Sequence, residues 1–598
     1  MMLIFPLIEL LLLAAAAVYY AAIKTHRICL KVIRPFWVLA GGTFLASIVM
    51  FLPLHYTAER AYSGALNSCC KAVLASIGDT IGMFSLNGGF DPISDFASSV
   101  PNSGLYSFVA SALYLAGPMM TLGVVLSFVR NLQAHCSYLL HYDREVHVFS
   151  ELNEKALTLC ASLRQREPKC ALVFTDVAGE DERSYELQKD AEQLHAICFR
   201  RDVLAVDFRR HSKKRCITFF LLGEDEAENI NQALQLMEEY HDREHSRIYL
   251  FASGSESEMM LSGCSRGKVI LRRVNEKRAL ILHHLYNSEA SLFRNAVPQP
   301  DEDAKLIHAV IVGLGGHGTE MLKALPWFCQ MEGYRVEIDA FDADPLAASH
   351  FSALCPELMS PEYNGVFLPG EAQYTIRIHS GMDVESLEFM QEVLALQSPT
   401  YVLVSLGDDI RNIRAAERLR VLLERMGSHA EIQAIVYDTR KKEALTNAAN
   451  WKGQPYRIEC IGDLAESYSA DIILDSELER DALSRHLQWG AEEEFWNFEY
   501  NYNSSVASAV HARMNALCGL AGAGKRAEDM TEEERTVFET NEHRRWNAYM
   551  RAEGYVYSGS KEKSSRNDLG KMHHDLVSYA ELSEEERRKD SRVAGKRN

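Results

Sequence analysis

The sequence lacks the basic excess that a nucleic-acid-binding protein needs. It has 63 Lys and Arg against 82 Asp and Glu, which gives a formal net charge of −19 over 598 residues. Neutralising a phosphate backbone requires a basic surface, so we expect no nucleic acid as a partner. This balance does not argue against a single bound nucleotide, which needs only a local site.

Motifs for metal binding and for catalysis are also missing. The 13 cysteines are scattered, with no C-x-x-C pair and no Cys/His cluster at zinc-ligand spacing. The sequence has no P-loop, no zincin helix and no nucleophile elbow. The pairs His283-His284 and His573-His574 have no partners at metal spacing. We therefore predict no metal and no catalytic residues, and we expect that the chain is not an enzyme.

Long apolar runs are confined to the first 130 residues. Three of them, at about 2–23, 32–54 and 105–129, are long enough to cross a bilayer core, which takes about 20 apolar residues. The basic residues near the first run follow it rather than precede it, which argues against a cleaved signal peptide. We predict a membrane domain at 1–135 with the lipid bilayer as its partner.

The distribution of basic residues predicts the orientation of these spans. The connector between the first two runs is basic, with Lys24, Arg27, Lys31 and Arg34. The loop before the third run has only Arg60 and Lys71. The positive-inside rule places the first connector in the cytoplasm. We predict a multi-pass protein of the inner (cell) membrane, with its N-terminus out and all residues after about 130 cytoplasmic.

The loop before the third run contains a short apolar stretch, 71–89, with Thr80-Ile81-Gly82-Met83-Phe84 near its centre. It faintly resembles the pore helix and filter of potassium channels, in which backbone carbonyls replace the water shell of the ion. Phe84 stands in place of the second filter glycine. Two hypotheses stay open: a pore loop that uses Thr80 and Gly82, and an amphipathic or re-entrant helix.

After about residue 142, short apolar runs alternate with helical stretches, the pattern of βαβ units on a parallel sheet. In the second half, a predicted strand runs into a G-x-G-x-x-G turn and a helix, and an acidic segment ends the next strand. The first glycine makes a tight turn, the second admits a pyrophosphate and the third packs the helix on the strand. The helix N-terminus attracts phosphate, and the acid can hold a ribose diol. We predict a site for NAD or another adenine nucleotide at Gly313, Gly315, Gly316, Gly318, Asp342 and Asp344.

The first half repeats this layout without the glycines. A predicted strand at 145–149 leads into Ser150-Glu151-Leu152-Asn153. Segment 217–226 is echoed by 401–409, and each is followed by an asparagine that opens a helix, Asn229 and Asn412. We predict an internal repeat of domains at 142–295 and 304–475. The first copy is expected to bind no dinucleotide, or to bind a ligand in another way.

Membrane spans followed by tandem folds with strand-GxGxxG and strand-(D/E)(D/E)-x-x-N resemble the TrkA-N or RCK family, over roughly 142–475. Gly313, Gly315, Gly318 and Asp342 match its nucleotide motif. The resemblance implies regulation of potassium channels or transporters, without hydride transfer. It also implies nucleotide or ion binding, a homo-oligomer (dimer or tetramer), and movement of membrane helices.

The segment 476–598 is predicted to be a helical linker followed by a small, mainly α-helical module. EH-x-x-W at 542–546, G-(Y/W)-x-Y at 554–557 and K-x-H-x-x-L-V-x-Y-x-E-L at 571–582 arrive in order. This series resembles the RyR domain, named after ryanodine receptor calcium channels and also found in bacteria. Its aromatic residues could equally form the core of a small module. The candidate ligand-binding residues are His543, Arg545, Trp546, Tyr557, His573 and Tyr579.

Together these features predict N-terminal transmembrane helices, two α/β Rossmann-like domains with doubly wound parallel sheets, and a helical C-terminal domain. The main hypothesis is a membrane-anchored cytosolic nucleotide sensor, either a ligand-gated channel-like protein or a bacterial immune membrane effector. The alternatives are a regulatory subunit of a separate potassium channel or transporter, and a membrane-bound NAD-dependent enzyme.

Overall fold

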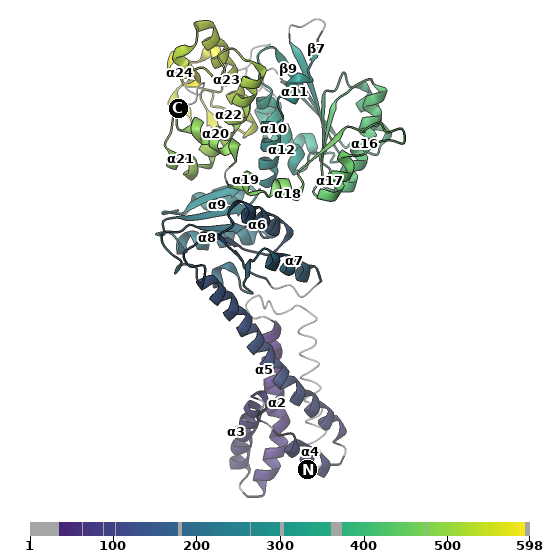
Figure 1. Ribbon diagram of the computed structural model, residues 1–598, viewed down its shortest axis with the longest axis vertical. Coiled ribbons are helices and arrows are strands. Elements are labelled where there is room, and N and C mark those ends of the chain that lie inside the picture. The colour runs from purple at the N-terminus through teal and green to yellow at the C-terminus, as the bar shows by residue number, and fades with distance from the viewer. Residues whose placement is uncertain are drawn as a thin grey trace. The chain divides into compact units, whose positions relative to one another are not determined.

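The computed structural model describes residues 35–591 except 63, 86, 88, 102, 178–181, 264, 300–303, 360–373 and 475. The chain divides into two compact units, Met1–Leu139 and Leu140–Asn598. Figure 1 colours them from purple at the N-terminus to yellow at the C-terminus. The predicted first span, 2–23, lies outside the described residues.

The described part of the first unit is helical, with α2 (Pro35–Arg60), α3 (Ala65–Phe84), α4 (Asp91–Ser99) and α5 (Gly104–Leu139). Segments Gly41–Arg60 and Gly104–Leu122 are long and apolar enough to cross a membrane. They overlap the second and third predicted spans. Large apolar side chains on both are exposed within the unit, among them Leu45, Phe108, Leu115 and Met119. Apolar surface of this kind typically packs against lipid or another protein.

The predicted pore-loop residues Thr80 and Gly82 both lie in helix α3. The Thr80 hydroxyl donates to the carbonyl of Ser76 at 2.8 Å, and the Gly82 carbonyl accepts the amide of Asn87 at 2.9 Å. A selectivity filter instead needs carbonyls that are free to face an ion. The structure therefore contradicts a filter conformation at these residues. The segment is helical, as the alternative hypothesis expected.

The second unit begins with a six-stranded parallel sheet in the order β3-β2-β1-β4-β5-β6. Its strands are β1 (Val146–Phe149), β2 (Ala171–Phe174), β3 (Ile197–Cys198), β4 (Ile217–Leu221), β5 (Ser246–Phe251) and β6 (Ile270–Val274). Its helices are α6 (Glu154–Arg166), α7 (Glu182–Gln193), α8 (Glu226–Glu239) and α9 (Ser255–Ser262). Every residue of β1, β2 and β4 is buried. Parallel strands covered on both faces read as continuous apolar runs, which is why the sequence predicted them.

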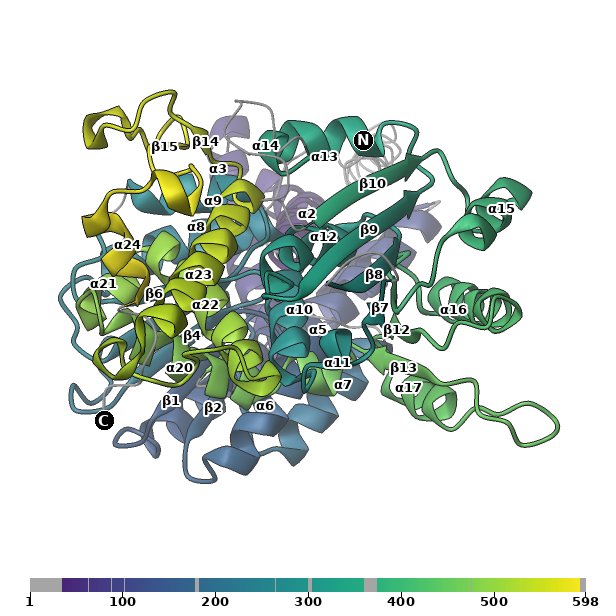
Figure 2. The same cartoon turned by 90° about the horizontal axis from the view of Figure 1, so that it is seen from above.

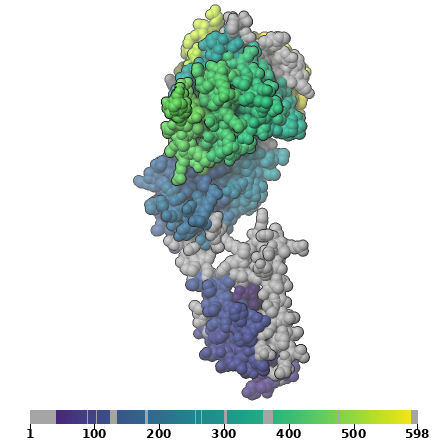
Figure 3. Space-filling model, turned by 90° about the vertical axis from the view of Figure 1, so that its right-hand side faces the viewer, coloured from purple at the N-terminus to yellow at the C-terminus, as the bar shows by residue number. Residues whose placement is uncertain are grey.

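A second sheet repeats this order as β10-β9-β8-β11-β12-β13, and a short β7 (Val297–Pro298) pairs antiparallel with β8. Its strands are β8 (Lys305–Val312), β9 (Tyr334–Asp342), β10 (Tyr374–Ser380), β11 (Tyr401–Val404), β12 (Glu431–Ile435) and β13 (Ile458–Ile461). Its helices are α12 (Gly316–Phe328), α13 (Ala347–Leu354), α14 (Pro356–Met359), α15 (Leu387–Ala395), α16 (Asp409–Arg425) and α17 (Thr439–Thr446). The green segment with α16 and α17 forms one outer surface of this unit (Figure 3). Both sheets have the strand order of doubly wound dinucleotide folds, so the predicted α/β class is confirmed.

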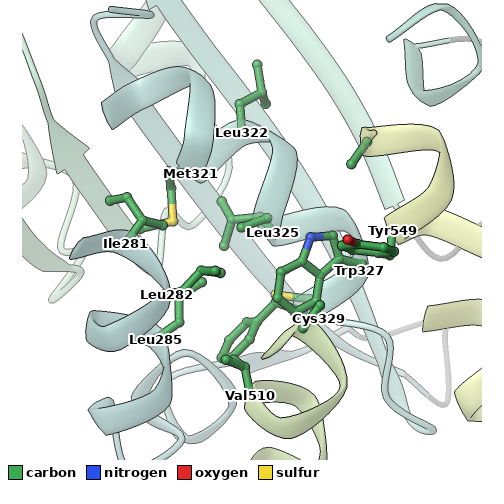
Figure 4. Close-up of a cluster of buried hydrophobic side chains, with 14 of the residues drawn as sticks. Ile281, Leu282, Leu285, Met321, Leu322, Leu325, Trp327, Cys329, Val510 and Tyr549 are labelled. Atoms are coloured by element: carbon green, nitrogen blue, oxygen red, sulfur yellow. The ribbon is translucent and has the colours of Figure 1, made fainter. Parts of the chain in front are cut away.

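The C-terminal part is mainly helical, with α20 (Glu477–His486), α21 (Glu492–Asn497), α22 (Glu499–Cys518), α23 (Glu532–Ala552) and α24 (Glu584–Ser591). A short pair of strands, β14 (Val556–Tyr557) and β15 (Met572–His573), lies near its end. Helices α22 and α23 lie beside α12 and α10 (Glu276–Asn287), as Figure 2 shows. They share one hydrophobic core, drawn in Figure 4, with members Leu285, Met321, Leu325, Val510 and Tyr549. The helical C-terminal part is therefore joined to the second sheet by a common core.

The chain also returns to the first sheet. After β13 come α18 (Leu464–Ser467) and α19 (Ala470–Ile473). Tyr468, Ala470 and Ile473 belong to the core that contains Phe149 and Phe220 of the first sheet. The end of the predicted second domain, at 475, thus packs on the first.

Candidate functional site

The predicted glycine turn joins β8 to α12, and its backbone leaves no room for side chains at two positions. Gly313 has a φ of +93°, and a Cβ there would lie 2.3 Å from the carbonyl oxygen of Ser405. A Cβ at Gly318 would lie 1.9 Å from the carbonyl oxygen of Gly313. The first and third glycines are therefore required for the tight turn and for close packing of helix on strand.

Gly315 differs, because it is the N-cap of α12 and has open space around it. Its φ is −63°, and a Cβ there would meet nothing closer than the Ser405 carbonyl oxygen at 3.9 Å. The first amides of a 13-residue helix begin at this point. Such amides lack partners within the helix and carry the positive end of its dipole, so they attract an anion.

The two predicted acids lie beside this turn and hold the backbone. Asp342 accepts the amide of Leu314 on Oδ2 at 2.6 Å and the amide of Asp344 on Oδ1 at 2.7 Å. Asp344 Oδ2 lies 3.0 Å from Nδ1 of His350. Asp342 thus shapes the glycine turn. Each of its carboxylate oxygens can accept a further hydrogen bond, so a ribose hydroxyl remains a suitable partner.

One residue beside the turn was missed by the sequence analysis. The side chain of Lys277, from α10, lies over Gly316, where an added Cβ would come 2.2 Å from Lys277 Cδ and 2.9 Å from Nζ. Within the described part of the chain, Lys277 forms no ion pair. A cation beside a helix N-terminus is unfavourable unless an anion joins them. The sequence pattern could not have shown this contact, because α10 and the glycine turn are far apart in the sequence.

The neighbours of Lys277 join three parts of the unit. Glu276 Oε2 lies 3.0 Å from Nζ of Lys155 in α6, and Arg278 Nη2 lies 2.5 Å from an oxygen of Glu553 at the end of α23. We call residues 276–278 the α10 junction. Successive residues of the junction thus contact the first sheet domain, the glycine turn and the C-terminal helices.

His317, the first residue after Gly316, is buried in α12. Burial lowers its pKa to about 4, and the nearby charge of Lys277 adds to this effect. The ring is therefore neutral at physiological pH. It lies 6.0 Å from the ring of Tyr437, between ring centroids.

The corresponding turn of the first domain is filled by its own side chains. Asn153 caps α6 by accepting the amide of Ala156 at 2.9 Å, and it donates to the Leu222 carbonyl at 2.9 Å. Glu151 accepts the amide of Glu224 at 3.2 Å. Burial raises the pKa of the Glu151 carboxyl. These contacts satisfy donors that would otherwise be available to a phosphate.

A cavity of about 710 Å³ lies among the C-terminal helices, and we call it the C-terminal cavity. Four of the six predicted ligand residues of this region line it: His543, Arg545, Trp546 and His573. The other two have contacts elsewhere. The Tyr557 amide donates to Glu357 at 3.0 Å, and the Tyr579 hydroxyl donates to Glu539 at 2.6 Å.

Several of the cavity residues are held by neighbours. Arg545 pairs with Glu542, with 2.7 Å between Nη2 and Oε1, and both residues are buried. The His543 ring bonds the Val577 carbonyl at 2.9 Å. Burial lowers the pKa of His573 to about 4, so that ring is neutral.

The fold also brings together side chains that can ligate metals. The ligand atoms of His147, Glu167 and Cys170 lie within 4.8 Å of one another, and so do those of His573-His574-Asp575. In the first group His147 lies in β1, whereas Glu167 and Cys170 lie in the turn between α6 and β2, so the sequence spacing of the group gave no signal. No protein-family model matches the chain, and no curated protein matches it either.

Proposed function

We propose that the chain is a membrane-anchored sensor that binds a small nucleotide, with NAD or another adenine nucleotide as the ligand class. The observation that carries the proposal is the glycine turn. It combines a helix N-terminus with open space at Gly315, an acid at the end of the next strand, and Lys277 beside Gly316. A phosphate is attracted to such amides and to a nearby ammonium group.

Membrane attachment is supported by the apolar segments Gly41–Arg60 and Gly104–Leu122. In this proposal they hold the protein in the inner membrane as a multi-pass protein, with the second unit in the cytoplasm. The resemblance to RCK and RyR domains suggests a ligand-gated channel-like protein or an immune membrane effector, assembled as a dimer or tetramer. A regulatory subunit of a separate channel is the alternative.

The α10 junction supplies a route by which binding affects the rest of the second unit. A phosphate that draws Lys277 toward it would shift the first turn of α10, and with it the ion pairs of Glu276 and Arg278. A ligand changes a conformational equilibrium only if it binds one state better than the other. In the variant Lys277→Met we expect the nucleotide to bind more weakly. We also expect that its binding no longer shifts the ion pairs of Glu276 and Arg278.

The test uses the full chain in lipid nanodiscs, titrated calorimetrically with NAD, NADH, ATP, ADP-ribose and cyclic nucleotides. Gly315→Asp is the informative variant, because its backbone accepts a side chain and Asp is a favoured N-cap. We expect it to fold and to weaken binding at least about tenfold, since placing like charges together costs several kcal/mol.

Ser386→Asp is the matched control, because Ser386 is the N-cap of α15 in the same domain and the change adds the same charge. It should bind as the wild type does. Equal affinity of Gly315→Asp and wild type would overturn the glycine turn as the site. For a ligand that binds, ion flux from liposomes distinguishes a channel-like protein from a subunit that acts on a partner.

A further inference from the structure

Three side chains of kinds that bind metal ions meet at the amino ends of β1 and β2 in the first sheet domain. A ring nitrogen of His147, a carboxylate oxygen of Glu167 and the Sγ atom of Cys170 all lie within 4.8 Å of one another. Zinc bonds of about 2.1 Å to nitrogen and oxygen and about 2.3 Å to sulfur place tetrahedral ligand atoms roughly 3.3–3.8 Å apart. Side-chain movements of about 1 Å therefore complete a three-ligand set.

The backbone fixes where these side chains lie. Strands β1 and β2 pair with His147 opposite Leu172, so Cys170, two residues earlier, lies on the same face as His147. A turn joins Glu167 to Cys170, with the Cys170 amide donating to the Glu167 carbonyl at 3.1 Å. Arg164 of α6 holds this turn by donating to the Cys170 carbonyl at 3.0 Å. The cluster is therefore assembled by the fold itself, before any ion binds.

The ring of His147 is buried and has a partner on one side only. Its Nε2 lies 3.1 Å from Oε2 of Glu167. A carboxylate only accepts, so Nε2 donates this bond and Nδ1 carries the lone pair. Among the described residues, no group bonds the buried Nδ1. Buried polar atoms without a partner are rare, and a metal ion is a common partner of an imidazole lone pair. Glu167 has two oxygens, so it can hold the ring and also bind the ion.

The ligand set favours zinc over magnesium or calcium. Thiolate and imidazole suit zinc, whereas magnesium and calcium prefer oxygen ligands. The carboxylate and the thiolate together neutralise a divalent ion, and the Cys170 thiol releases its proton to solvent on binding. Arg166, Arg247 and Arg272 line the adjoining cavity, so the cavity as a whole does not attract a cation. The two anionic ligands supply the attraction.

An ion can reach the cluster from a cavity of about 1210 Å³ that His147 and Glu167 line. The Glu167 side chain is 38% exposed. Cys216 lines the same cavity, so a water molecule or this thiol can complete a four-ligand shell. We propose that His147, Glu167 and Cys170 form a zinc site in the first sheet domain. The site lies at the opposite ends of the strands from the turn 150–153 and in a different domain from the glycine turn.

The test uses the full chain in nanodiscs, freed of metal by a chelator, and titrated with Co²⁺, Zn²⁺ and Mg²⁺. A thiolate bound to cobalt gives a sulfur-to-metal charge-transfer band. The group His573-His574-Asp575 has no thiol and cannot produce this band. We expect cobalt to bind with the band, zinc to displace it, and magnesium to have no effect.

Cys170→Ser should remove the band and weaken zinc binding at least about tenfold, measured against a competing chelator. Cys198→Ser is the matched control, because Cys198 lies in β3 of the same sheet and outside the cluster. Zinc should raise the melting temperature of the wild type and of the control but not that of Cys170→Ser. A band that survives Cys170→Ser, or zinc binding weaker than about 10 μM in the wild type, would overturn the site.

Glu167→Gln keeps the proposal testable if Cys170→Ser does not fold, because its side chain is partly exposed. The amide still accepts a hydrogen bond from His147 but has no charge. This variant should keep the charge-transfer band and weaken zinc binding about tenfold, since the thiolate remains and one anionic ligand is lost. Zinc affinity equal to that of the wild type would overturn the three-ligand site.

Discussion

The two sheet domains of the second unit have the same strand order and differ where the first strand enters the first helix. In the first domain three residues separate the end of β1 at Phe149 from the N-cap Asn153. In the second domain only two separate the end of β8 at Val312 from the N-cap Gly315. The shorter turn forces helix and strand together and accounts for the two glycines that cannot carry a side chain.

This difference places different groups at the two helix N-termini. In the first domain the side chains of Asn153 and Glu151 satisfy nearby amides. In the second domain the N-cap has no side chain, and the side chain of Lys277 lies over the next residue, Gly316. In our proposal a doubly wound sheet alone does not make a nucleotide site, and the open glycine turn of the second domain is also required.

The largest effect is expected from Gly318→Ala. The added Cβ would lie 1.9 Å from the Gly313 carbonyl, a backbone atom that cannot rotate away. We expect a loss of about 3 kcal/mol in the free energy of unfolding, measured by denaturant titration of the full chain. The first domain has Ala156 at the same helical position, and Ala156→Gly should cost only about 1 kcal/mol. Equal losses would show that the shorter turn is not under this constraint.

An intermediate effect is expected at Asn229 and Asn412, which occupy equivalent positions in the two domains. Asn229 bonds both the amide and the carbonyl of Gly223, each at 2.9 Å, and donates to the Phe251 carbonyl at 3.3 Å. Asn412 bonds the Leu406 amide at 2.6 Å and the Ile435 carbonyl at 2.7 Å. Replacing either with Ala should cost about 2 kcal/mol, because each variant loses at least two hydrogen bonds, and the third bond of Asn229 is long. A difference of more than about 1 kcal/mol between the variants in thermal unfolding would contradict this equivalence.

The pH dependence of stability is expected to carry a contribution from His317, which follows the glycine turn of the second domain. Its pKa is lowered to about 4 in the folded protein, against 6.5 for the ordinary side chain. Between these values the unfolded chain binds a proton that the folded chain does not, so stability falls as the pH falls from 6.5 toward 4. His317→Asn should reduce the slope of stability against pH by up to about 1.4 kcal/mol per pH unit. An unchanged slope in pH-dependent unfolding would mean that His317 takes up a proton while the protein is folded.

The smallest effect is expected at the N-caps. Asn153→Ala removes the cap of α6 and should cost about 1 kcal/mol. Gly315→Asp should be neutral or slightly stabilising, since an acid at an N-cap is favourable. Thermal unfolding of both variants checks the signs. A strongly destabilised Gly315→Asp would mean that the space around Gly315 is not open, and its binding result would then carry no weight.

The sequence predicted the central strands of both sheets well, because they are fully buried and read as apolar runs. It missed β10, whose residues alternate between polar and apolar, with Thr375, Arg377 and His379 on this edge strand. An edge strand pairs on one side only, so its composition gives a weaker signal.

The candidate sites were predictable only in part, because a sequence pattern reports local requirements and not contacts between distant elements. The glycines of the turn have local backbone requirements, so their pattern is visible in the sequence. Lys277 lies on α10, an element distant in the sequence, and only the tertiary fold brings it beside the turn. The Thr80 and Gly82 hypothesis failed because a short apolar stretch cannot distinguish a filter from a helix.

The most direct test of the account is amide hydrogen exchange on the full chain in nanodiscs, with and without the tightest-binding nucleotide. The account predicts ligand-dependent protection in the turn 313–318 and the first turn of α12, with no change in the matching segment 150–156. Protection of 150–156 instead, or equal protection of both segments, would contradict the claim that the second domain is the ligand-binding copy.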